Sequence, residues 1–351
     1  MDVVGLAEIA ALFGINKQVV SNWRARKVGF PSPMAELKSG PVWRREDIVK
    51  WAKRENIELA ESQKPRGNAS TKKAPTRHAK ITAIMNMKGG VGKSTLATNL
   101  GWYAAYERDY RVLLVDLDPQ FNLSQYILGS AGCEQLLREK RPTVENLFRA
   151  TAADGRPENL KKAIWKVAEW RDGSCLHLVP SCLELAWTAE TASKRTVILK
   201  NYLEQVRSEY DLVIVDCAPT ESVLSTAAYH AADYVFVPVK PEFLSTIGLP
   251  LLLKSMNEFG SVNGVESVPA LGGIILNDTM DKLEHEKSTK AVQDSAAECK
   301  WPVFENSLSH SESYPAGARL GKPIFMTDKA RSTKKTELAR VGNEFLMRMG
   351  L

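Results

Sequence analysis

Short apolar runs recur between residues 80 and 351, and segments with the apolar spacing of helices separate them. Two of the runs, Val112–Val115 and Leu212–Val215, are apolar at every position, which is typical of strands buried on both faces of a sheet. Strands that alternate with helices form mostly parallel sheets with helices on both faces. The pattern therefore predicts an α/β fold for residues 80–351.

Residues 1–59 carry a different pattern. Leu6–Gly14 reads as an amphipathic helix ended by glycine, and Lys17–Arg26 as a second helix after a short turn. A hairpin follows at Leu37–Trp43 with its turn at Ser39–Gly40, and another helix starts at Arg44. This order resembles the winged helix-turn-helix of MerR-like and excisionase-like proteins. It predicts a small N-terminal DNA-binding domain, with a helical hairpin that binds protein as the alternative.

In this small domain the two helices share a predicted core and leave polar residues facing outward. The second helix of such a motif can enter a major groove, where Gln and Asn read bases and Lys and Arg hold phosphates. The predicted core residues are Ile9, Leu12, Val19, Val20 and Trp23. The predicted DNA-binding residues are Lys17, Gln18, Ser21, Asn22, Arg24 and Arg26.

Residues 60–79 have almost no apolar content and are rich in Pro, Gly, Ser and Lys, which predicts a flexible basic linker. The basic residues are also concentrated in the first 80 residues. Residues 1–80 hold 16 Lys and Arg against 8 Asp and Glu, whereas the remaining residues hold 31 against 33. Because the basic excess lies in the front segment, nucleic acid is its expected partner.

Composition narrows the class further. The chain has 351 residues, of which 44% are hydrophobic and 25% charged, as in ordinary globular proteins. Apolar runs stay well below the ~18 residues of a membrane-spanning helix, and an N-terminal signal pattern is absent. The five cysteines are scattered without metal-site spacing. We therefore expect a cytoplasmic protein in a reducing compartment, with no membrane partner.

A glycine-rich loop, Lys88–Thr95, separates a predicted strand at Ala79–Met85 from a predicted helix that starts at Ser94. Glycines allow backbone N–H groups to approach phosphates closely, and the helix N-terminus favours anions. Lys93 would reach the β- and γ-phosphates, and the Ser94 hydroxyl would ligate Mg²⁺. The loop therefore predicts a site for ATP and Mg²⁺, with these binding residues: Gly89, Gly90, Val91, Gly92, Lys93, Ser94 and Thr95.

Carboxylates follow two of the apolar runs. Asp116 and Asp118 end the strand that starts at Arg111, and Asp216 ends the strand that starts at Tyr210. Ligands bind at the carboxyl ends of strands in such sheets. Asp216 can hold Mg²⁺ through water, as the carboxylate of a Walker B strand does.

These motifs resemble the deviant Walker A loop and the Asp-x-Asp-Pro-Gln segment of the ParA/MinD family of P-loop ATPases. The resemblance covers most of residues 80–340 and includes Gly321–Ile324. It implies that Lys88 reaches across a homodimer to the partner's nucleotide. It also implies that Asp118 orients or activates the attacking water and that Asp116 supports the Mg²⁺ region. Phe121 stands where family members often have glycine.

Other segments carry weaker signals. Asn277 follows the strand Gly272–Leu276 and is a candidate adenine contact by position. Residues 130–178 read as a helical insertion that includes helices at Glu134–Arg138, Thr143–Arg149 and Leu160–Trp170. Five basic residues are candidates for non-specific DNA contacts or plain surface charges: Arg319, Lys322, Arg331, Lys334 and Lys335.

The last helix, Lys334–Met349, has one apolar face. The pattern favours docking on the core over a MinD-like membrane helix. The apolar face comprises Leu338, Val341, Phe345, Leu346 and Met349.

Taken as a ParA-type partition ATPase, the chain would dimerise on ATP, bind DNA without sequence preference and hydrolyse ATP when a ParB-type partner stimulates it. It would act at the nucleoid, and its front domain could repress its own operon. Two alternatives stay open: a transcription factor regulated by nucleotide without a motor role, and a MinD-like membrane-associated ATPase.

Overall fold

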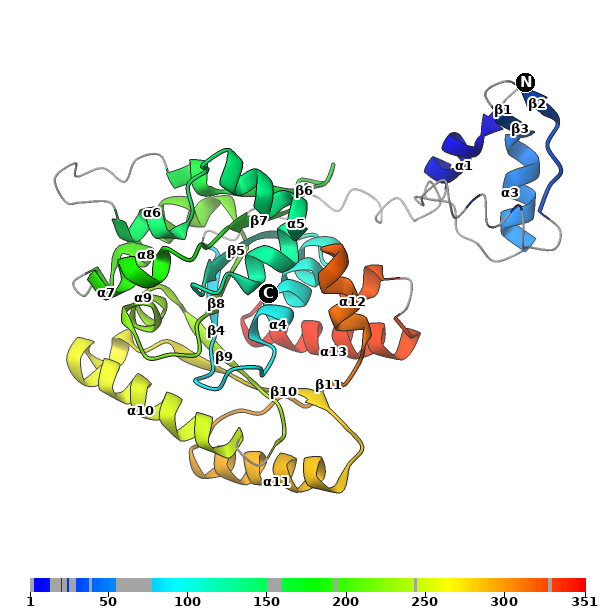
Figure 1. Ribbon diagram of the computed structural model, residues 1–351. Helices are drawn as coiled ribbons and strands as arrows, with labels where there is room; N and C mark the ends of the chain where they lie inside the picture. Colours follow the sequence, from blue (N-terminus) through cyan, green and yellow to red (C-terminus); the bar gives the residue numbers. More distant parts are fainter. Residues whose placement is uncertain are drawn as a thin grey trace. The chain divides into compact units, whose positions relative to one another are not determined.

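The structure, a computed structural model, describes residues 3–12, 20, 24, 30–37, 40–54, 78–149, 160–191, 195–242, 245–327 and 330–351. The chain divides into two compact units, Met1–Lys73 and Ala74–Leu351. The division falls inside the segment predicted to be a linker. Figure 1 labels the helices and strands of both units.

The first unit has a three-stranded antiparallel sheet with the order β1-β3-β2. Its strands are β1 (Val3–Gly5), β2 (Ala35–Leu37) and β3 (Gly40–Arg44), and its helices include α1 (Leu6–Leu12) and α3 (Arg45–Arg54). The structure thus confirms the hairpin, the first helix and the helix that follows the hairpin, whereas most of the predicted helix Lys17–Arg26 lies outside the described residues. Strand β1 was not predicted, because three residues before an amphipathic helix carry too little pattern to indicate a strand.

The core of the first unit is aromatic. Trp43 and Trp51 are fully buried, and the ring of Phe30 meets both edge-on with centroids 5.9 and 4.7 Å away. Ile9 and Val20 are buried with them, as predicted. The side chains of the other predicted core residues lie outside the described part of the chain: Leu12, Val19 and Trp23.

The second unit is built on an eight-stranded sheet with the order β11-β10-β9-β4-β8-β5-β7-β6. Every pairing is parallel except that of β6 with β7. The strands are β4 (Lys80–Ile84), β5 (Arg111–Leu117), β6 (Trp165–Glu169), β7 (Cys175–Val179), β8 (Leu212–Cys217), β9 (Tyr234–Val239), β10 (Ala270–Thr279) and β11 (Leu308–Ser309). This confirms the predicted α/β fold with a mostly parallel sheet.

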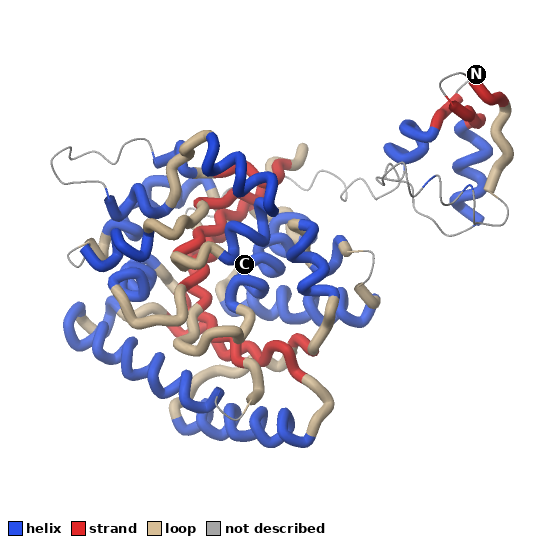
Figure 2. The backbone as a smooth tube through the Cα atoms, viewed as in Figure 1, coloured by secondary structure: helices blue, strands red, loops and turns tan. Residues whose placement is uncertain are grey.

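Helices cover both faces of this sheet, as Figure 2 shows with the strands in red between the helices. In β8, Leu212 and Ile214 join the core on one face, whereas Val213 and Val215 join the core on the other. The first face is packed by α4 (Lys93–Trp102), α5 (Asn122–Arg138) and α13 (Ser332–Arg348). The second is packed by α6 (Val144–Arg149), α7 (Leu185–Thr191), α8 (Ile198–Val206), α9 (Val223–Ala231), α10 (Ser245–Asn263) and α11 (Leu283–Glu298).

The predicted helix at Leu160–Trp170 is wrong. A short 3-10 turn at Leu160–Ala163 leads into β6, which pairs antiparallel with β7. A tight turn causes this, because Gly173 has φ 88° and its N–H donates to the Trp170 carbonyl at 3.0 Å. The returning strand completes its hydrogen bonds along the sheet edge, which outweighs a weak helical pattern. The other two predicted helices of the insertion, Glu134–Arg138 and Thr143–Arg149, are confirmed and lie in α5 and α6, whereas residues 150–159 lie outside the described residues.

Helix α13 docks on the core, as the sequence favoured. Leu338, Val341 and Phe345 are fully buried in the second core, and Leu346 and Met349 nearly so. Glu344, also buried, accepts hydrogen bonds from the backbone N–H groups of residues 305 and 306. Within the described ranges the structure has no helix both long and apolar enough to cross a membrane.

Candidate nucleotide-binding site

The glycine-rich loop joins β4 to α4, at the carboxyl edge of the sheet. Gly90 and Gly92 have φ of 75° and 88°, a left-handed conformation that glycine adopts without strain. Gly92 directly precedes the first turn of α4, so the loop ends at a helix N-terminus. A Cβ atom on Gly92 would lie 2.3 Å from Nδ2 of Asn277, which itself donates to the Val91 carbonyl at 2.8 Å. Asn277 therefore holds the loop from the side of β10.

Lys93 is buried and folds back over the loop. Its Nζ donates to the carbonyl oxygens of Asn86 and Lys88, both at 3.2 Å. Burial lowers the pKa of Lys93, and the charges of Asp216 and Asp118 oppose that shift. A buried cation is therefore placed at the base of the loop, facing two carboxylates.

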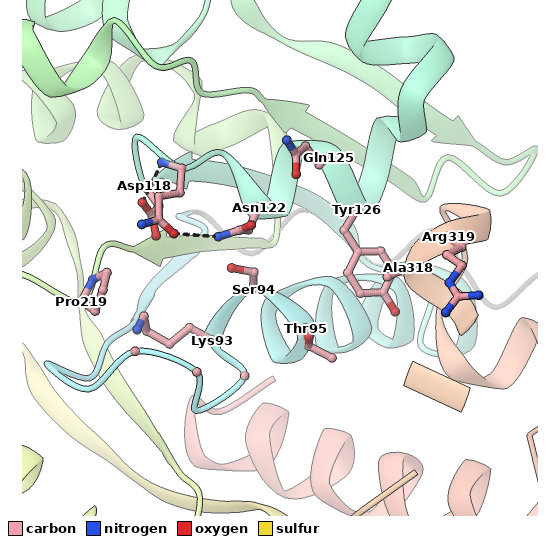
Figure 3. A pocket seen from close by; sticks show the side chains of 14 residues that line it. Lys93, Ser94, Thr95, Asp118, Asn122, Gln125, Tyr126, Pro219, Ala318 and Arg319 are labelled. Carbon is pink, nitrogen blue, oxygen red and sulfur yellow. Dashed lines mark hydrogen bonds between the residues drawn. The ribbon is translucent and has the colours of Figure 1, made fainter. Parts of the chain in front are cut away.

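A pocket of about 490 Å³ opens over the loop. Figure 3 shows its walls, with Lys93 and Asp118 near one end and Tyr126 and Arg319 near the other. The residues that line it are Gly89, Gly90, Gly92, Lys93, Ser94, Thr95, Asp118, Gln120, Asn122, Gln125, Tyr126, Pro219, Ala318 and Arg319. Most of the predicted phosphate-binding residues and Asp118 are thus brought together in one cavity.

Asp118 lies in the wall of this pocket and is 5% exposed. Its Oδ1 accepts the N–H of Gln120 at 2.9 Å, and its own N–H donates to Oδ1 of Asp116 at 3.2 Å. Among the described residues, Oδ2 of Asp118 accepts no hydrogen bond. One carboxylate oxygen is therefore fixed by the backbone while the other can accept a proton or a water.

Asp116, predicted to support Mg²⁺, lies behind the pocket wall and is fully buried. Its Oδ2 accepts the N–H and the hydroxyl of Ser124 at 2.8 and 2.6 Å, and that hydroxyl accepts the N–H of Ser181 at 2.9 Å. Burial raises the pKa of Asp116 to about 7, against the lowering effect of these hydrogen bonds. In this arrangement Asp116 ties the end of β5 to the first turn of α5.

Asp216 is fully buried at the end of β8, and its pKa is raised well above the ordinary value, first by burial and next by the charge of Asp116. The Ser94 hydroxyl is near enough to lower this pKa in part. The position of the Ser94 hydroxyl does not, however, satisfy the criteria for a hydrogen bond, so both Asp216 oxygens lack a hydrogen-bond partner among the described residues. A buried carboxylate without a partner is costly, and a bound cation would remove that cost. Ser94 and Asp216 therefore fit Mg²⁺, which often takes one or two protein ligands beside phosphate oxygens.

Lys88 does not line the pocket. Its Nζ forms an ion pair with Oε2 of Glu242 at 3.0 Å, and Lys240 pairs with Oε1 of the same carboxylate at 2.8 Å. Hydrogen bonds from Lys240 and Lys88 lower the pKa of Glu242. Lys240 also pairs with Asp278 at 3.0 Å, which links the loop to the ends of β9 and β10.

The six residues predicted to bind DNA through the helix-turn-helix belong to the first unit. Arg24, the one of these six that the structure describes, is exposed and helical, with its guanidinium carbon 5.8 Å from the centre of the Trp43 ring. The remaining five lie outside the described residues: Lys17, Gln18, Ser21, Asn22 and Arg26.

Sequence reasoning missed several residues of the pocket wall. Gln120, Asn122, Gln125 and Tyr126 come directly after Asp118, and helical spacing brings the last three to one side of α5. The helical spacing of these polar residues could therefore have predicted that they face the site. The position of Arg319 could not be read in this way, because α12 (Ser313–Leu320) is remote in sequence from the loop.

Comparisons with known proteins agree with this geometry. Residues 79–264 match the family model described as an AAA domain. The sporulation initiation inhibitor protein Soj of Bacillus subtilis is 36% identical over 262 residues, which cover 71% of this chain and 91% of Soj. The chromosome-partitioning ATPase Soj of Treponema pallidum is 30% identical over 213 residues, covering 59% of this chain and 75% of that protein.

Among solved structures, apo McdA of Cyanothece has a similar fold, with a TM-score of 0.63 at 22% identity, covering 76% of this chain and 99% of that one. The family match spans more than half of the chain, and the relatives are matched over most of their length. The chain therefore belongs to the AAA-domain family of P-loop proteins and, within it, to the ParA-type ATPases.

Proposed function

We propose that this ParA-type ATPase binds ATP·Mg²⁺ in the loop pocket and uses its hydrolysis to segregate DNA. The observation that carries the proposal is that Lys93 and Asp118 line one end of the pocket, and that Asp216, which has no hydrogen-bond partner among the described residues, is close enough to Lys93 to act on its pKa. A cation and carboxylates around a glycine-rich loop suit phosphoryl transfer to water, where positioning and charge stabilisation dominate. The partition role is supported by the chromosome-partitioning relative from Treponema pallidum.

The roles of individual residues follow from their positions. The loop N–H groups and Lys93 would hold the phosphates, and Ser94 and Asp216 would hold Mg²⁺, which when bound neutralises charge on the phosphate oxygens. Oδ2 of Asp118 would accept a hydrogen bond from the attacking water and hold it in line. Because Asp118 is the one titratable side chain in the described pocket wall placed to do so, basal hydrolysis would be slow.

On dimerisation, Lys88 would contact the nucleotide bound by the partner subunit. In the single chain this lysine is paired with Glu242, so contact with a partner's nucleotide requires that pair to break. The side chains of Lys88 and Glu242 are 25% and 42% exposed, so water screens the pair and it contributes little to stability. Exchange from this carboxylate to a triphosphate, which carries more negative charge, is therefore favourable.

The rest of the proposal concerns partners. The ATP-bound homodimer would bind DNA without sequence preference, and a ParB-type partner would stimulate hydrolysis and release the dimer. Residues 1–59 would bind an operator and repress transcription of the operon. The protein would then be cytoplasmic and associated with the nucleoid. Burial of the apolar face of α13 weighs against a MinD-like membrane role.

Two variants test the cycle. Lys88→Ala should retain ATP affinity by calorimetry but lose ATP-dependent dimerisation by light scattering. Asp118→Ala should bind ATP, form the dimer and turn over little. If Asp118→Ala hydrolyses ATP at the normal stimulated rate, its proposed role is excluded. Absence of any turnover in the wild-type protein with DNA and a ParB-type partner would favour a transcription factor that uses the nucleotide only as a ligand.

A further inference from the structure

Arg319 is the second cation of the nucleotide pocket. Among the described residues that line the pocket, Lys93 and Arg319 carry the positive side chains. Lys93 is satisfied by two backbone carbonyls, whereas Arg319 makes no ion pair or hydrogen bond within the described part of the chain. Figure 3 places the two cations apart, with Tyr126 beside Arg319. An exposed guanidinium in a pocket wall is available to a ligand.

The direction of the bound nucleotide decides which part of it reaches Arg319. In a loop of this kind the lysine contacts the β- and γ-phosphates, while the loop N–H groups hold the α- and β-phosphates. Lys93 and Asp118 therefore mark the γ-phosphate end of the pocket. Thr95, Tyr126 and Arg319 lie toward the other end, where the α-phosphate and the nucleoside would lie.

The support of Arg319 is rigid. Asn99, fully buried in α4, donates to the Tyr126 hydroxyl at 3.4 Å and accepts the N–H of Ile324 at 2.8 Å. Gly317 packs so closely that a Cβ atom there would lie 2.6 Å from the Lys322 carbonyl and 3.1 Å from the Tyr126 hydroxyl. Helix α12 and the loop after it are thus fixed to the phosphate-loop helix and to α5. A side chain carried on such a support binds with little rearrangement.

Building on the proposed function, we propose that Arg319 is a nucleotide-binding residue that contacts the α-phosphate of ATP. The planar guanidinium can donate two parallel hydrogen bonds to phosphate oxygens, which an ammonium group cannot do. The contact is present with both ATP and ADP, because both carry the α-phosphate. Arg319 therefore sets affinity for the nucleotide and does not take part in the chemical step.

The test compares nucleotide affinities by calorimetry and turnover by a phosphate-release assay in the full chain. Arg319→Ala should weaken ATP and ADP alike, by about tenfold, since hydrogen bonds to charged groups are worth about that much or more. KM for ATP should rise with kcat unchanged, and Arg319→Lys should recover part of the affinity. Lys322→Ala is the matched control, because Lys322 is an exposed cation three residues on and outside the pocket wall. It should leave both affinities unchanged.

The outcomes separate the alternatives. A loss for ATP alone would place Arg319 at the γ-phosphate and overturn the assignment. Unchanged nucleotide affinity in Arg319→Ala with weakened ATP-dependent DNA binding would make Arg319 a DNA contact instead. An equal loss of nucleotide affinity in Lys322→Ala would show a general effect of positive charge and would also overturn the assignment of Arg319 to the α-phosphate. If the wild-type chain binds no ATP, the proposed function itself fails, which is a distinct result.

Discussion

At the scale of single residues, the backbone of Phe121 adopts a conformation that is unusual for a residue with a side chain. Phe121 has φ 45° and ψ 36°, and it directly precedes α5. Its N–H donates to the Asp118 carbonyl at 2.8 Å, so the conformation is part of the turn that shapes the pocket wall. A left-handed conformation is strained for a side chain with a Cβ atom. Glycine at this position would adopt the same geometry without strain.

Two variants at this position isolate the backbone effect. Phe121→Ala removes the ring but keeps the Cβ atom, whereas Phe121→Gly removes both. We expect the glycine variant to be more stable than the alanine variant by about 1 kcal/mol, the reverse of the usual order of these residues. Urea unfolding of both proteins measures the difference. Equal stabilities, or a more stable alanine variant, would show that the left-handed conformation is absent in solution.

His177 gives a pH dependence at the same scale. It is buried in β7, bonded to the Tyr210 hydroxyl at 2.9 Å and to Oε1 of Glu169 at 3.3 Å. Burial lowers the pKa of His177, with Glu169 opposing the shift. The unfolded chain takes up this proton near pH 6.5 and the folded chain resists it. The stability that neutral His177 contributes is therefore complete above about pH 6.5 and is lost as pH falls below it.

His177→Gln should flatten that part of the stability profile. Urea unfolding of the two proteins between about pH 7.5 and 5 should show a smaller decline in the variant, because one group that binds protons on unfolding is gone. His230, whose pKa burial also lowers, keeps its own contribution in both proteins. An identical slope in both proteins would mean that His177 titrates normally in the fold.

At the scale of elements, close packing between strands sets tight limits on substitution. Gly272 of β10 is buried, and a Cβ atom there would lie 2.3–2.6 Å from ring atoms of Phe236 in β9. That ring packs in turn against Phe304 and Phe345, with centroids 5.8 and 4.7 Å away. The contact therefore joins two neighbouring strands to the docked helix α13, and the ring has little room to move.

Gly272→Ala should accordingly destabilise the second unit by about 1–3 kcal/mol through overpacking. The double variant Gly272→Ala with Phe236→Leu should lose less stability than the sum of the two single changes, because the smaller side chain makes room for the methyl group. Chemical unfolding of the four proteins completes this cycle. If the losses of unfolding free energy are strictly additive, the strands β9 and β10 accommodate the methyl group without any change at the Phe236 ring.

At the scale of the whole molecule, the chain joins two units that have separate cores. The first unit buries an aromatic cluster around Trp43 and Trp51, and the second buries a core on each face of its sheet. Separate cores allow the units to fold and act independently. The division of labour that we propose, with operator binding in the first unit and nucleotide chemistry in the second, depends on this separation.

Deletion of residues 1–59 tests that division. The truncated protein should keep its ATP affinity, because the pocket is built entirely from residues of the second unit. It should lose protection of a specific operator in DNA footprinting, while ATP-dependent binding to unrelated DNA persists. Retention of the specific footprint would place sequence recognition in the second unit.

The sequence alone determined the class of the second unit, its phosphate loop and its strand-end carboxylates. Each of these features depends on residues that are adjacent in the sequence. An apolar run indicates a buried strand, and a glycine-rich loop indicates a backbone that can approach phosphates. The docking of the last helix on the core was also predicted from the sequence, because a helix with one apolar face is stabilised when another surface covers that face.

Which residues from distant parts of the chain meet depended on the three-dimensional fold. It paired Lys88 with Glu242, placed Asp116 behind the pocket wall and brought Arg319 into the pocket. It also left Asp216 without a hydrogen-bond partner among the residues that the structure describes. It also turned the segment at Trp165–Glu169 into an edge strand. Such contacts depend on how strands are ordered and how helices pack, and hydrophobic periodicity within a segment carries no information about either.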